Sequence, residues 1–397
     1  MIAFEEALKY VLEHTQDYGT EIIPFSQADN RVLAEPVLAD RDFPPFNRST
    51  RDGIAINSKA LEEGLKQFQI KGVTPAGSPQ LNLENHRDCI EIMTGAILPN
   101  NTDTIIMYEH LERVGDAFIL KEDVSLGQNI HFQASDFEKG ATLLEPGIRL
   151  SAAEIGVLAS VGKHEVLVKT NPKVAIVSTG DELVDVDQIP LPYQIRKSNS
   201  YSLQSLLKNE GILSKNFHLV DDKEILAKKL KEQIQQQDVL ILSGGVSKGK
   251  YDFLPEVFNE LGVEKVFHRV LQRPGKPFWF GKAPNGTLVF ALPGNPVSSF
   301  LCTQRYFVTW LNASLGLSSA IFPHGILTRA TTFKPDLTYF LQVKVSYNEN
   351  GQILATPVDG NGSGDLANLV DADAFLQLPR GKDLFEKGTI YPLLFYR

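Results

Sequence analysis

The sequence predicts a multidomain α/β protein, with a central three-layer domain in which helices cover both faces of a parallel sheet, and with two smaller all-β units. The first observation is that short apolar runs alternate with helical segments from Lys173 to about residue 320, as they do in parallel sheets. The second is that residues 53–133 and 321–397 instead carry strand-like runs separated by Gly, Pro and Asn turns. The third is the length of 397 residues, which favours roughly two to four domains over a single core.

The first part of the chain is expected to belong to a discontinuous domain. Residues 3–15 place apolar side chains on one helical face, and the helix–strand pattern resumes at Ala152–Ser160 and Glu165–Lys169. The polar segment Asp40–Asp52 contains Pro44-Pro45 and is typical of a linker. We therefore expect a discontinuous α/β linker domain, an inserted β domain, a central α/β domain and a C-terminal β domain, with boundaries at 1–40 and 134–171, 41–133, 172–320, and 321–397.

The central domain is predicted from alternating strands and helices. The strands are Val174–Ser178, Ile212–Val220, Val239–Leu242, Lys265–Leu271 and Thr287–Leu292. The helices are Tyr201–Asn209, Lys223–Gln235, a segment after Asp252 and a long segment from Val297. Because the two kinds of element alternate, the strands are expected to run in one direction, with their carboxyl ends at one edge of the sheet.

The stretch Val239–Phe253 contains the most informative strand end. An apolar strand ends in Ser243-Gly244-Gly245, where missing Cβ atoms let backbone N–H groups approach a ligand, and Asp252 can cap the helix that follows. A strand, a glycine turn and a helix in this order are typical of an anion-binding crevice in an α/β sheet. Similar residues follow the neighbouring strands, and the strand-end positions are Thr179, Gly180, Asp181, Glu182, Asp221, Ser243, Gly244, Gly245, Ser247, Pro293, Gly294 and Asn295.

Acidic residues among these positions indicate a magnesium site. Asp181, Glu182, Asp221 and Asp252 offer the hard oxygen ligands that Mg²⁺ takes together with substrate phosphates. Lys276 in the RPGKP turn could act as a point charge for an oxyanion. Taken singly, Asp252 could be only a helix cap and Asp221 only a helix start, but their shared sheet edge favours a site.

Composition excludes several classes of protein. The net charge of −9 and the lack of a Lys/Arg-rich run argue against nucleic acid as a partner. No segment reaches about 18 apolar residues and the first residues do not form a signal peptide, so we expect no membrane association. The two cysteines, Cys89 and Cys302, show no pairing or zinc-binding pattern, which favours a cytoplasmic location.

A series of motifs resembles those of the molybdopterin molybdenumtransferases, the MoeA and gephyrin E-domain family. In order along the whole chain they are QADNRVLAEPVLADRDFPPFNRSTRDGIAI, MTGAILP, STGDEL, SNSYSL, ILSGGVSKGKYDF, RPGKP, ALPGNPVSS and GNGSGDL. The resemblance implies an elongated homodimer with a molybdopterin-binding central domain and a C-terminal β-barrel. It also implies a Mg²⁺-dependent transferase of molybdenum cofactor biosynthesis, which places molybdenum from molybdate on adenylylated molybdopterin and releases AMP.

The resemblance assigns roles to individual residues. It implies that Asp52 in RDG and Thr94 in MTG act across the dimer interface from the central domain. The catalytic residues it implies are Asp52, Thr94, Glu182, Asp221 and Asp252, of which the last three would hold the metal. Lys276, Ser298 and Ser363 match positions expected around the molybdate or the pterin.

The chain departs from the family pattern in ways that bear on how molybdate is held. Lys197 replaces the usual acid of the DSN motif, Ala134-Ser135 stands in the usual GED, and Gln342 replaces an Arg in the C-terminal domain. Lys248 and Lys250 flank the central turn, where a small apolar and an acidic residue are usual. Gln342 could weaken the hold on molybdate, with Lys197 compensating, or could simply face solvent.

Two other functions remain open from the sequence. A molybdopterin adenylyltransferase has a single α/β domain similar to residues 173–320, but that class lacks the motifs around Asp52 and Thr94. Such an enzyme is also a possible partner of this chain. The third interpretation is a binding or scaffold member of the family that has lost the chemistry; the retained acids favour an enzyme.

Overall fold

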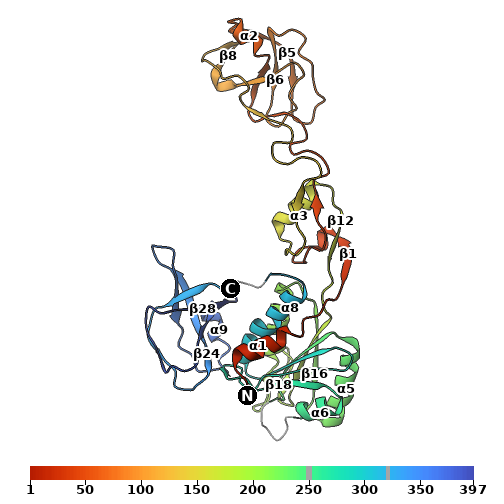
Figure 1. Cartoon of the computed structure of the whole chain (residues 1–397), viewed down its shortest axis with the longest axis vertical. Helices are drawn as coiled ribbons and strands as arrows, with labels where there is room; N and C mark the ends of the chain where they lie inside the picture. Colours follow the sequence, from red (N-terminus) through yellow and green to blue (C-terminus); the bar gives the residue numbers. More distant parts are fainter. Residues whose placement is uncertain (247–252, 319–321) are drawn as a thin grey trace. The chain divides into compact units, whose positions relative to one another are not determined.

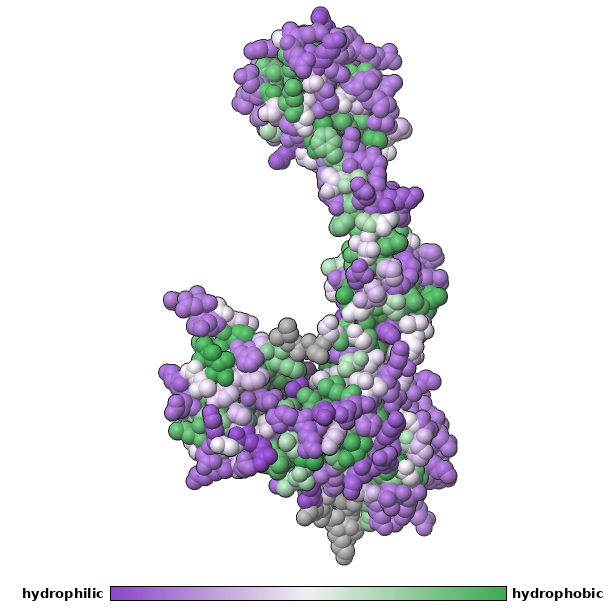
Figure 2. Space-filling model, viewed as in Figure 1, coloured by the Kyte–Doolittle hydropathy of each residue, from purple (hydrophilic) through white to green (hydrophobic). Residues whose placement is uncertain are grey.

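The computed structural model describes residues 1–246, 253–318 and 322–397 (Figure 1). The chain forms two compact units, of which the larger comprises Met1–Ala34, Gly147–Ser151 and Val166–Arg397, and the smaller Glu35–Pro146 and Ala152–Glu165. Hydrophilic side chains cover much of the visible surface (Figure 2). Within the described residues, no helix is both long enough and apolar enough to span a membrane. The finer division into four domains stays a prediction.

The larger unit is built on a six-stranded sheet in the order β16-β13-β17-β21-β20-β18. The bounds of these strands are β16 (Ser214–Leu219), β13 (Val174–Thr179), β17 (Val239–Ser243), β21 (Leu288–Leu292), β20 (Trp279–Lys282) and β18 (Glu264–His268). The first four pair in parallel, whereas β20 is antiparallel to both of its neighbours. The prediction of a parallel sheet is confirmed for these first four strands. Strand β20 was not predicted from the sequence, and it adds one antiparallel strand near the edge of the sheet.

Helices cover both faces of this sheet, as the prediction of three layers requires. They are α4 (Ser198–Asn209), α5 (Lys223–Gln236), α6 (Leu254–Glu260), α7 (Pro296–Cys302), the π-helix η3 (Thr303–Phe307) and α8 (Val308–Ser314). Along β13, Ile176 packs in the core with α4, α7 and α8, while Val177 packs in the core with α5 and α6. Every residue of β13, β17 and β21 is buried, because successive side chains of a covered strand enter opposite cores.

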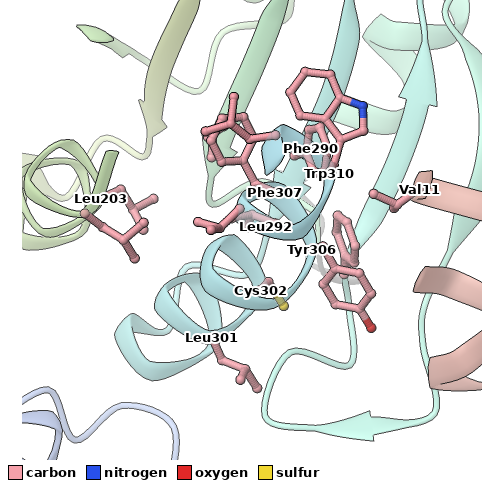
Figure 3. Close-up of a cluster of buried hydrophobic side chains, with 14 of the residues drawn as sticks. Val11, Leu203, Phe290, Leu292, Leu301, Cys302, Tyr306, Phe307 and Trp310 are labelled. Atoms are coloured by element: carbon pink, nitrogen blue, oxygen red, sulfur yellow. The ribbon is translucent and has the colours of Figure 1, made fainter. Parts of the chain in front are cut away.

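The helix α1 (Phe4–Leu12) adds to the first of these cores. Its early residues Phe4, Ala7 and Val11 are buried, and Figure 3 shows Val11 beside the aromatic side chains of η3 and α8. The indole N–H of Trp310 donates a hydrogen bond of 2.9 Å to the carbonyl of His14, just beyond α1. After α1, β1 (Thr20–Pro24) pairs with β12 (Glu165–Lys169), two strands that lie far apart in the sequence.

The last part of the larger unit is a closed barrel of five strands, as the family resemblance implied. They are β22 (His324–Leu327), β24 (Thr338–Tyr347), β25 (Ile353–Pro357), β26 (Ala374–Leu378) and β28 (Ile390–Phe395). The barrel closes because β24 pairs with both β25 and β26, while β22 and β28 complete the circuit. A short helix, α9 (Asn368–Asp371), precedes β26.

The smaller unit contains a second six-stranded sheet, in the order β7-β4-β6-β5-β9-β8. The bounds are β4 (Gly53–Ile56), β5 (Gln67–Thr74), β6 (Asp88–Ile92), β7 (Thr104–Met107), β8 (Leu111–Val114) and β9 (Ala117–Leu120), with α2 (Lys59–Glu62) between β4 and β5 and α3 (Ala152–Ser160) after the sheet. Ile54, Phe68, Cys89, Ile106 and Phe118 form its core. The unit is therefore mainly a β domain, as the sequence pattern predicted.

Gly53, the last residue of the RDG turn, is expected to be needed for the stability of this unit. A Cβ atom at Gly53 would lie 1.9 Å from the carbonyl oxygen of Ile106 on the paired strand β7. We expect Gly53→Ala to lower the free energy of unfolding by about 1–3 kcal/mol, the usual cost of overpacking a core. Gly156→Ala is the matched control, because a Cβ there has no neighbour within 4 Å and an exposed helical Ala gains about 0.5–1 kcal/mol. Urea titrations that give equal midpoints for Gly53→Ala and wild type would contradict the prediction.

Candidate active site

The carboxyl ends of β13, β17 and β21 surround a cavity of about 500 Å³. The strands end together because they pair in register, with Ser178 beside Ser243 and Ser243 beside Leu292. Of the strand-end residues predicted from the sequence, those that line the cavity are Thr179, Gly180, Glu182, Asp221, Ser243, Gly244, Gly245, Gly294 and Asn295. The structure thus brings together side chains that are scattered over more than a hundred residues of sequence.

The glycine turn after β17 passes very close to β13. Gly244 and Gly245 have φ values of 109° and 68°, which L-residues with a side chain rarely adopt. A Cβ at Gly244 would lie 2.9 Å from the carbonyl oxygen of Thr179, and one at Gly245 would lie 2.8 Å from the Leu254 side chain. The two glycines are therefore required both by backbone conformation and by space.

Asn199, in the first turn of α4, ties two of the strand ends together. Its side-chain amide donates to the Ser243 hydroxyl at 2.8 Å and to the Gly294 carbonyl at 2.7 Å. Its Oδ1 atom is buried without a hydrogen-bond partner among the described residues, and so is the hydroxyl of Thr179. Buried polar atoms are normally satisfied, so these two atoms in the cavity wall point to a ligand.

The acidic residues have different positions at the cavity. Glu182 and Asp221 line it, while Asp181 accepts a 3.1 Å hydrogen bond from the backbone N–H of Asp221. Asp222, not Asp221, caps α5 by accepting from the N–H of Ile225. The interpretation of Asp221 as the start of the helix is therefore wrong, and Asp221 is one of the residues that line the cavity.

Two predicted site residues, Ser247 and Asp252, lie outside the described residues, as do Lys248 and Lys250. The described residues contain no group of three or more His, Cys, Asp or Glu side chains arranged to hold a metal ion. Glu182 and Asp221 nevertheless fit the donor set that Mg²⁺ uses at phosphate substrates, which is one or two carboxylates completed by phosphate oxygens and water.

Asp52 and Thr94 lie together in the smaller unit. The backbone N–H and the hydroxyl of Thr94 donate to Asp52 Oδ1 at 2.6 and 2.9 Å. These hydrogen bonds, the backbone one above all, lower the pKa of the exposed Asp52 carboxyl below its ordinary value. Asp52 is therefore held as an oriented carboxylate at neutral pH.

A second cavity, of about 360 Å³, contains Gln342 and Ser363. The oxygen of the Gln342 amide accepts from Asn368 at 3.1 Å, but its nitrogen is buried without a partner among the described residues. Gln342 thus lines a cavity, so the interpretation that it simply faces solvent is wrong. Arg273 lines the same cavity, and Asn295 connects it to the first cavity by donating to the Ser363 hydroxyl at 2.8 Å.

Three further predicted residues do not line either cavity. Lys276 is exposed on its turn, whereas Ser298 in α7 and Pro293 after β21 are buried. Their proposed roles therefore stay predictions.

Lys197 lines the first cavity, and the positive charge of its ammonium group is balanced by a neighbouring carboxylate. Its ammonium lies 2.7 Å from Asp185, which also accepts from the Tyr201 hydroxyl at 2.8 Å. The hydrogen bond from Lys197 is the main cause that lowers the pKa of Asp185 to about 2, so the Asp185 carboxyl stays ionised at neutral pH. Ala134, another departure from the family pattern, has a φ of 62° and is half-buried in the smaller unit.

Comparisons with known proteins cover nearly the whole chain. Residues 2–162 match the MoeA N-terminal region (domain I and II), residues 175–313 a probable molybdopterin binding domain, and residues 324–394 the MoeA C-terminal region (domain IV). A protein of Synechocystis sp. named molybdopterin molybdenumtransferase is 39% identical over 396 residues, which cover 99% of both chains. This chain belongs to the MoeA family.

Other MoeA proteins support this relation. A molybdopterin molybdenumtransferase of Bacillus subtilis is 32% identical and is matched over 100% of this chain and 94% of its own length. The crystal structure of a molybdopterin biosynthesis moeA protein from Pyrococcus horikoshii OT3 matches over 100% of both chains, with a TM-score of 0.81 and 26% identity. All lining residues of the first cavity except Gly364 lie within the part of the chain that matches the probable molybdopterin binding domain.

Sequence reasoning missed Asn199 as a site residue. The predicted helix was Tyr201–Asn209, so Asn199 was placed just before it and was given no role. In the structure α4 begins at Ser198, which brings Asn199 into its first turn and against the strand ends. The signal that could have found it is an Asn directly before a helix that follows one of the sheet's strand ends.

Proposed function

We propose that the protein is a molybdopterin molybdenumtransferase of molybdenum cofactor biosynthesis, which transfers molybdenum from molybdate to adenylylated molybdopterin and releases AMP. The observation that carries this proposal is the first cavity, where orphaned polar atoms and two carboxylates meet within the part of the chain that matches the molybdopterin binding domain. The names of full-length MoeA relatives support the same reaction.

The pterin substrate would be oriented by this chain's own polar groups. The hydroxyl of Thr179 and the Oδ1 atom of Asn199 are the buried atoms that lack partners, so they would bind the pterin or its phosphate. Glu182 and Asp221, together with Asp252, would hold Mg²⁺. When bound, Mg²⁺ would neutralise charge on the pyrophosphate oxygens and so favour the departure of AMP.

Molybdate, the other substrate, would bind in the second cavity. It is a tetrahedral dianion, which requires several hydrogen-bond donors and at least one cation. The Ser363 hydroxyl and the unpartnered amide nitrogen of Gln342 supply donors, and the guanidinium of Arg273 supplies charge. Lys276, on the same turn as Arg273, is the second cation we propose.

The active unit would be a homodimer in the cytoplasm, with Asp52 and Thr94 of one chain completing the site of the other. Their location in a different compact unit from the first cavity is compatible with such sharing. A molybdopterin adenylyltransferase would supply the adenylylated substrate and is the protein partner we propose.

A turnover assay separates this function from its alternatives. The purified protein would be incubated with adenylylated molybdopterin, Mg²⁺ and molybdate, and AMP would be quantified by chromatography. Molybdate-dependent AMP release is expected. Adenylation of free molybdopterin would instead indicate an adenylyltransferase, and binding of the adenylylated substrate without AMP release would indicate a scaffold member of the family.

Gln342→Arg is expected to lower the molybdate concentration required for AMP release. A charge-assisted hydrogen bond contributes about 1.5–3 kcal/mol, and a neutral one about 1 kcal/mol. The variant is therefore expected to bind molybdate roughly 5–30-fold more tightly. Lys197→Ala is expected to raise the requirement, because Asp185 would then leave an uncompensated negative charge near the first cavity. Lys208→Ala, at an exposed lysine on the same helix α4, is the control. Superimposable molybdate titrations of all four proteins would contradict both expectations.

A further inference from the structure

A third cavity, of about 450 Å³, lies among α1, the η3–α8 helix and strand β28. It shares no lining residue with the two cavities described above. Helices α1 and α8 contact each other beside it, and both carry labels in Figure 1. Its wall is largely apolar and includes Leu8, Leu12, Val308, Leu393 and Leu394.

One wall residue, Arg305, is a buried cation that makes no ion pair with a described carboxylate, although the exposed Glu5 of α1 lies near enough to raise the pKa of Arg305 slightly against the effect of burial. Arg305 is only 7% exposed, and its side chain makes no hydrogen bond or ion pair with any described residue. Its guanidinium carbon lies 4.3 Å from the ring centroid of Phe322 and 5.1 Å from that of Phe4. Burial lowers the pKa of Arg305 to about 10, so the side chain is still charged at neutral pH.

Arg305 lies in the π-helix η3, where the consecutive residues Arg305, Tyr306 and Phe307 are all buried. Single-turn π bulges occur frequently at functional sites. The two aromatic rings offset part of the desolvation of the guanidinium through cation–π contacts. The two rings do not accept hydrogen bonds from the five N–H groups of the guanidinium, which lie in the guanidinium plane. A hydrogen-bond acceptor in that plane is therefore still missing among the described residues.

Three other polar residues of this cavity already have hydrogen-bond or ion-pair partners. Glu210 pairs with Arg149 at 3.5 Å, and Asn312 accepts from the same arginine at 2.7 Å. The hydroxyl of Thr309 donates to the backbone carbonyl of Arg305 at 2.7 Å. Because Glu210 is paired with Arg149, Arg305 is the one unpaired charge among the described lining residues, with Glu5 of α1 acting on it from outside the lining.

We propose that this cavity binds a small organic carboxylate, with its carboxylate on Arg305 and its apolar part against the leucines of α1 and β28. A planar carboxylate can accept two parallel hydrogen bonds from a guanidinium, and a buried uncompensated charge gains most from such a partner. The cavity has the volume and the mainly apolar lining of a small-molecule site. This site is independent of the proposed transferase reaction, because it uses none of the same residues.

Calorimetric titration of the full-length protein tests the proposal. The probes are hexanoate and 4-phenylbutyrate. Each is compared with the neutral alcohol of the same carbon skeleton, hexan-1-ol or 4-phenylbutan-1-ol. We expect saturable binding of a carboxylate to the wild type, and a loss of at least about tenfold in Arg305→Met, equivalent to about 1.4 kcal/mol. Alcohol binding is expected to be unchanged by Arg305→Met, because the apolar wall is retained.

Two variants control for folding and for general charge effects. Arg329→Met removes an exposed arginine that pairs with Asp359 outside the cavity, and it is expected to bind the carboxylates as the wild type does. Arg305→Lys keeps a charge with fewer donors and is expected to retain part of the affinity, so the proposal can still be tested if Arg305→Met does not fold. The proposal is overturned if neither carboxylate binds the wild type, if acid and alcohol bind equally, or if Arg305→Met retains the carboxylate affinity. Arg305 would then serve only as a structural cation between two rings.

Discussion

Asp221→Asn is expected to fold normally and to lose AMP release by at least about 100-fold. The substitution keeps the size of the side chain but replaces a charged oxygen ligand by a neutral one at the cavity that Glu182 also lines. Loss of a group that only supports a metal ligand typically lowers metal affinity or activity about 10–100-fold. Loss of a direct ligand should lower activity further. Single-turnover AMP release at about 1 mM Mg²⁺ measures the effect, and Asp252→Ala is expected to behave in the same way.

The adjacent residue provides a matched control for this experiment. Asp222→Asn makes the same chemical change one position later, where the side chain caps α5. Asn is as good an N-cap as Asp, so this variant is expected to be as stable and as active as the wild type. If Asp221→Asn retained wild-type turnover, Asp221 would have no role in holding the metal.

Heterodimers of two inactive variants are expected to recover about half of the wild-type activity. In the proposed dimer, a chain with Asp52→Ala keeps its own first cavity, and a partner with Asp221→Asn supplies an intact Asp52 to it. One of the two sites is then complete, whereas each homodimer has none. The measurement is AMP release by heterodimers purified through two different affinity tags.

The same experiment tests the sharing of residues between chains. If each chain formed its own complete site, both sites of the heterodimer would carry a defect and activity would stay at the homodimer level. An active Asp52→Ala homodimer would instead remove Asp52 from the site altogether. The hydrogen bonds from Thr94 make the second outcome unexpected, because they fix the Asp52 carboxylate in one orientation.

The strand ends of the central sheet were predictable because one physical rule governs them. Parallel strands in register must end at the same edge, so Thr179, Ser243 and Asn295 could be expected to meet without knowledge of any side-chain contact. Strand β20 was missed because it has only four residues and begins just one residue, Phe278, after the RPGKP turn. The Asn285-Gly286 pair before β21 is a typical hairpin signal and could have indicated it.

Other parts of the site depend on packing that no short pattern records. Asp52 and Thr94 are 42 positions apart, and only the resemblance to the family linked them before their hydrogen bonds were seen. An isolated arginine in a helix is ordinarily a surface residue, so the sequence around Arg305 predicted nothing unusual. Its burial follows from the aromatic side chains of α1 and of the segment before the barrel, which reach it from distant parts of the chain.

In the proposed reaction, the hydrogen bond between Asn295 and Ser363 would couple the affinities of the two cavities for their ligands. Asn295 belongs to the wall of the first and Ser363 to the wall of the second, and the Ser363 carbonyl also accepts from the N–H of Val297 at 3.1 Å. A ligand that accepts from the Ser363 hydroxyl would fix the orientation of this hydroxyl, whose oxygen can still accept from the Asn295 amide. Thermodynamic linkage then requires the two effects to be equal. If bound molybdate changes the affinity for the pterin by some factor, bound pterin changes the affinity for molybdate by the same factor.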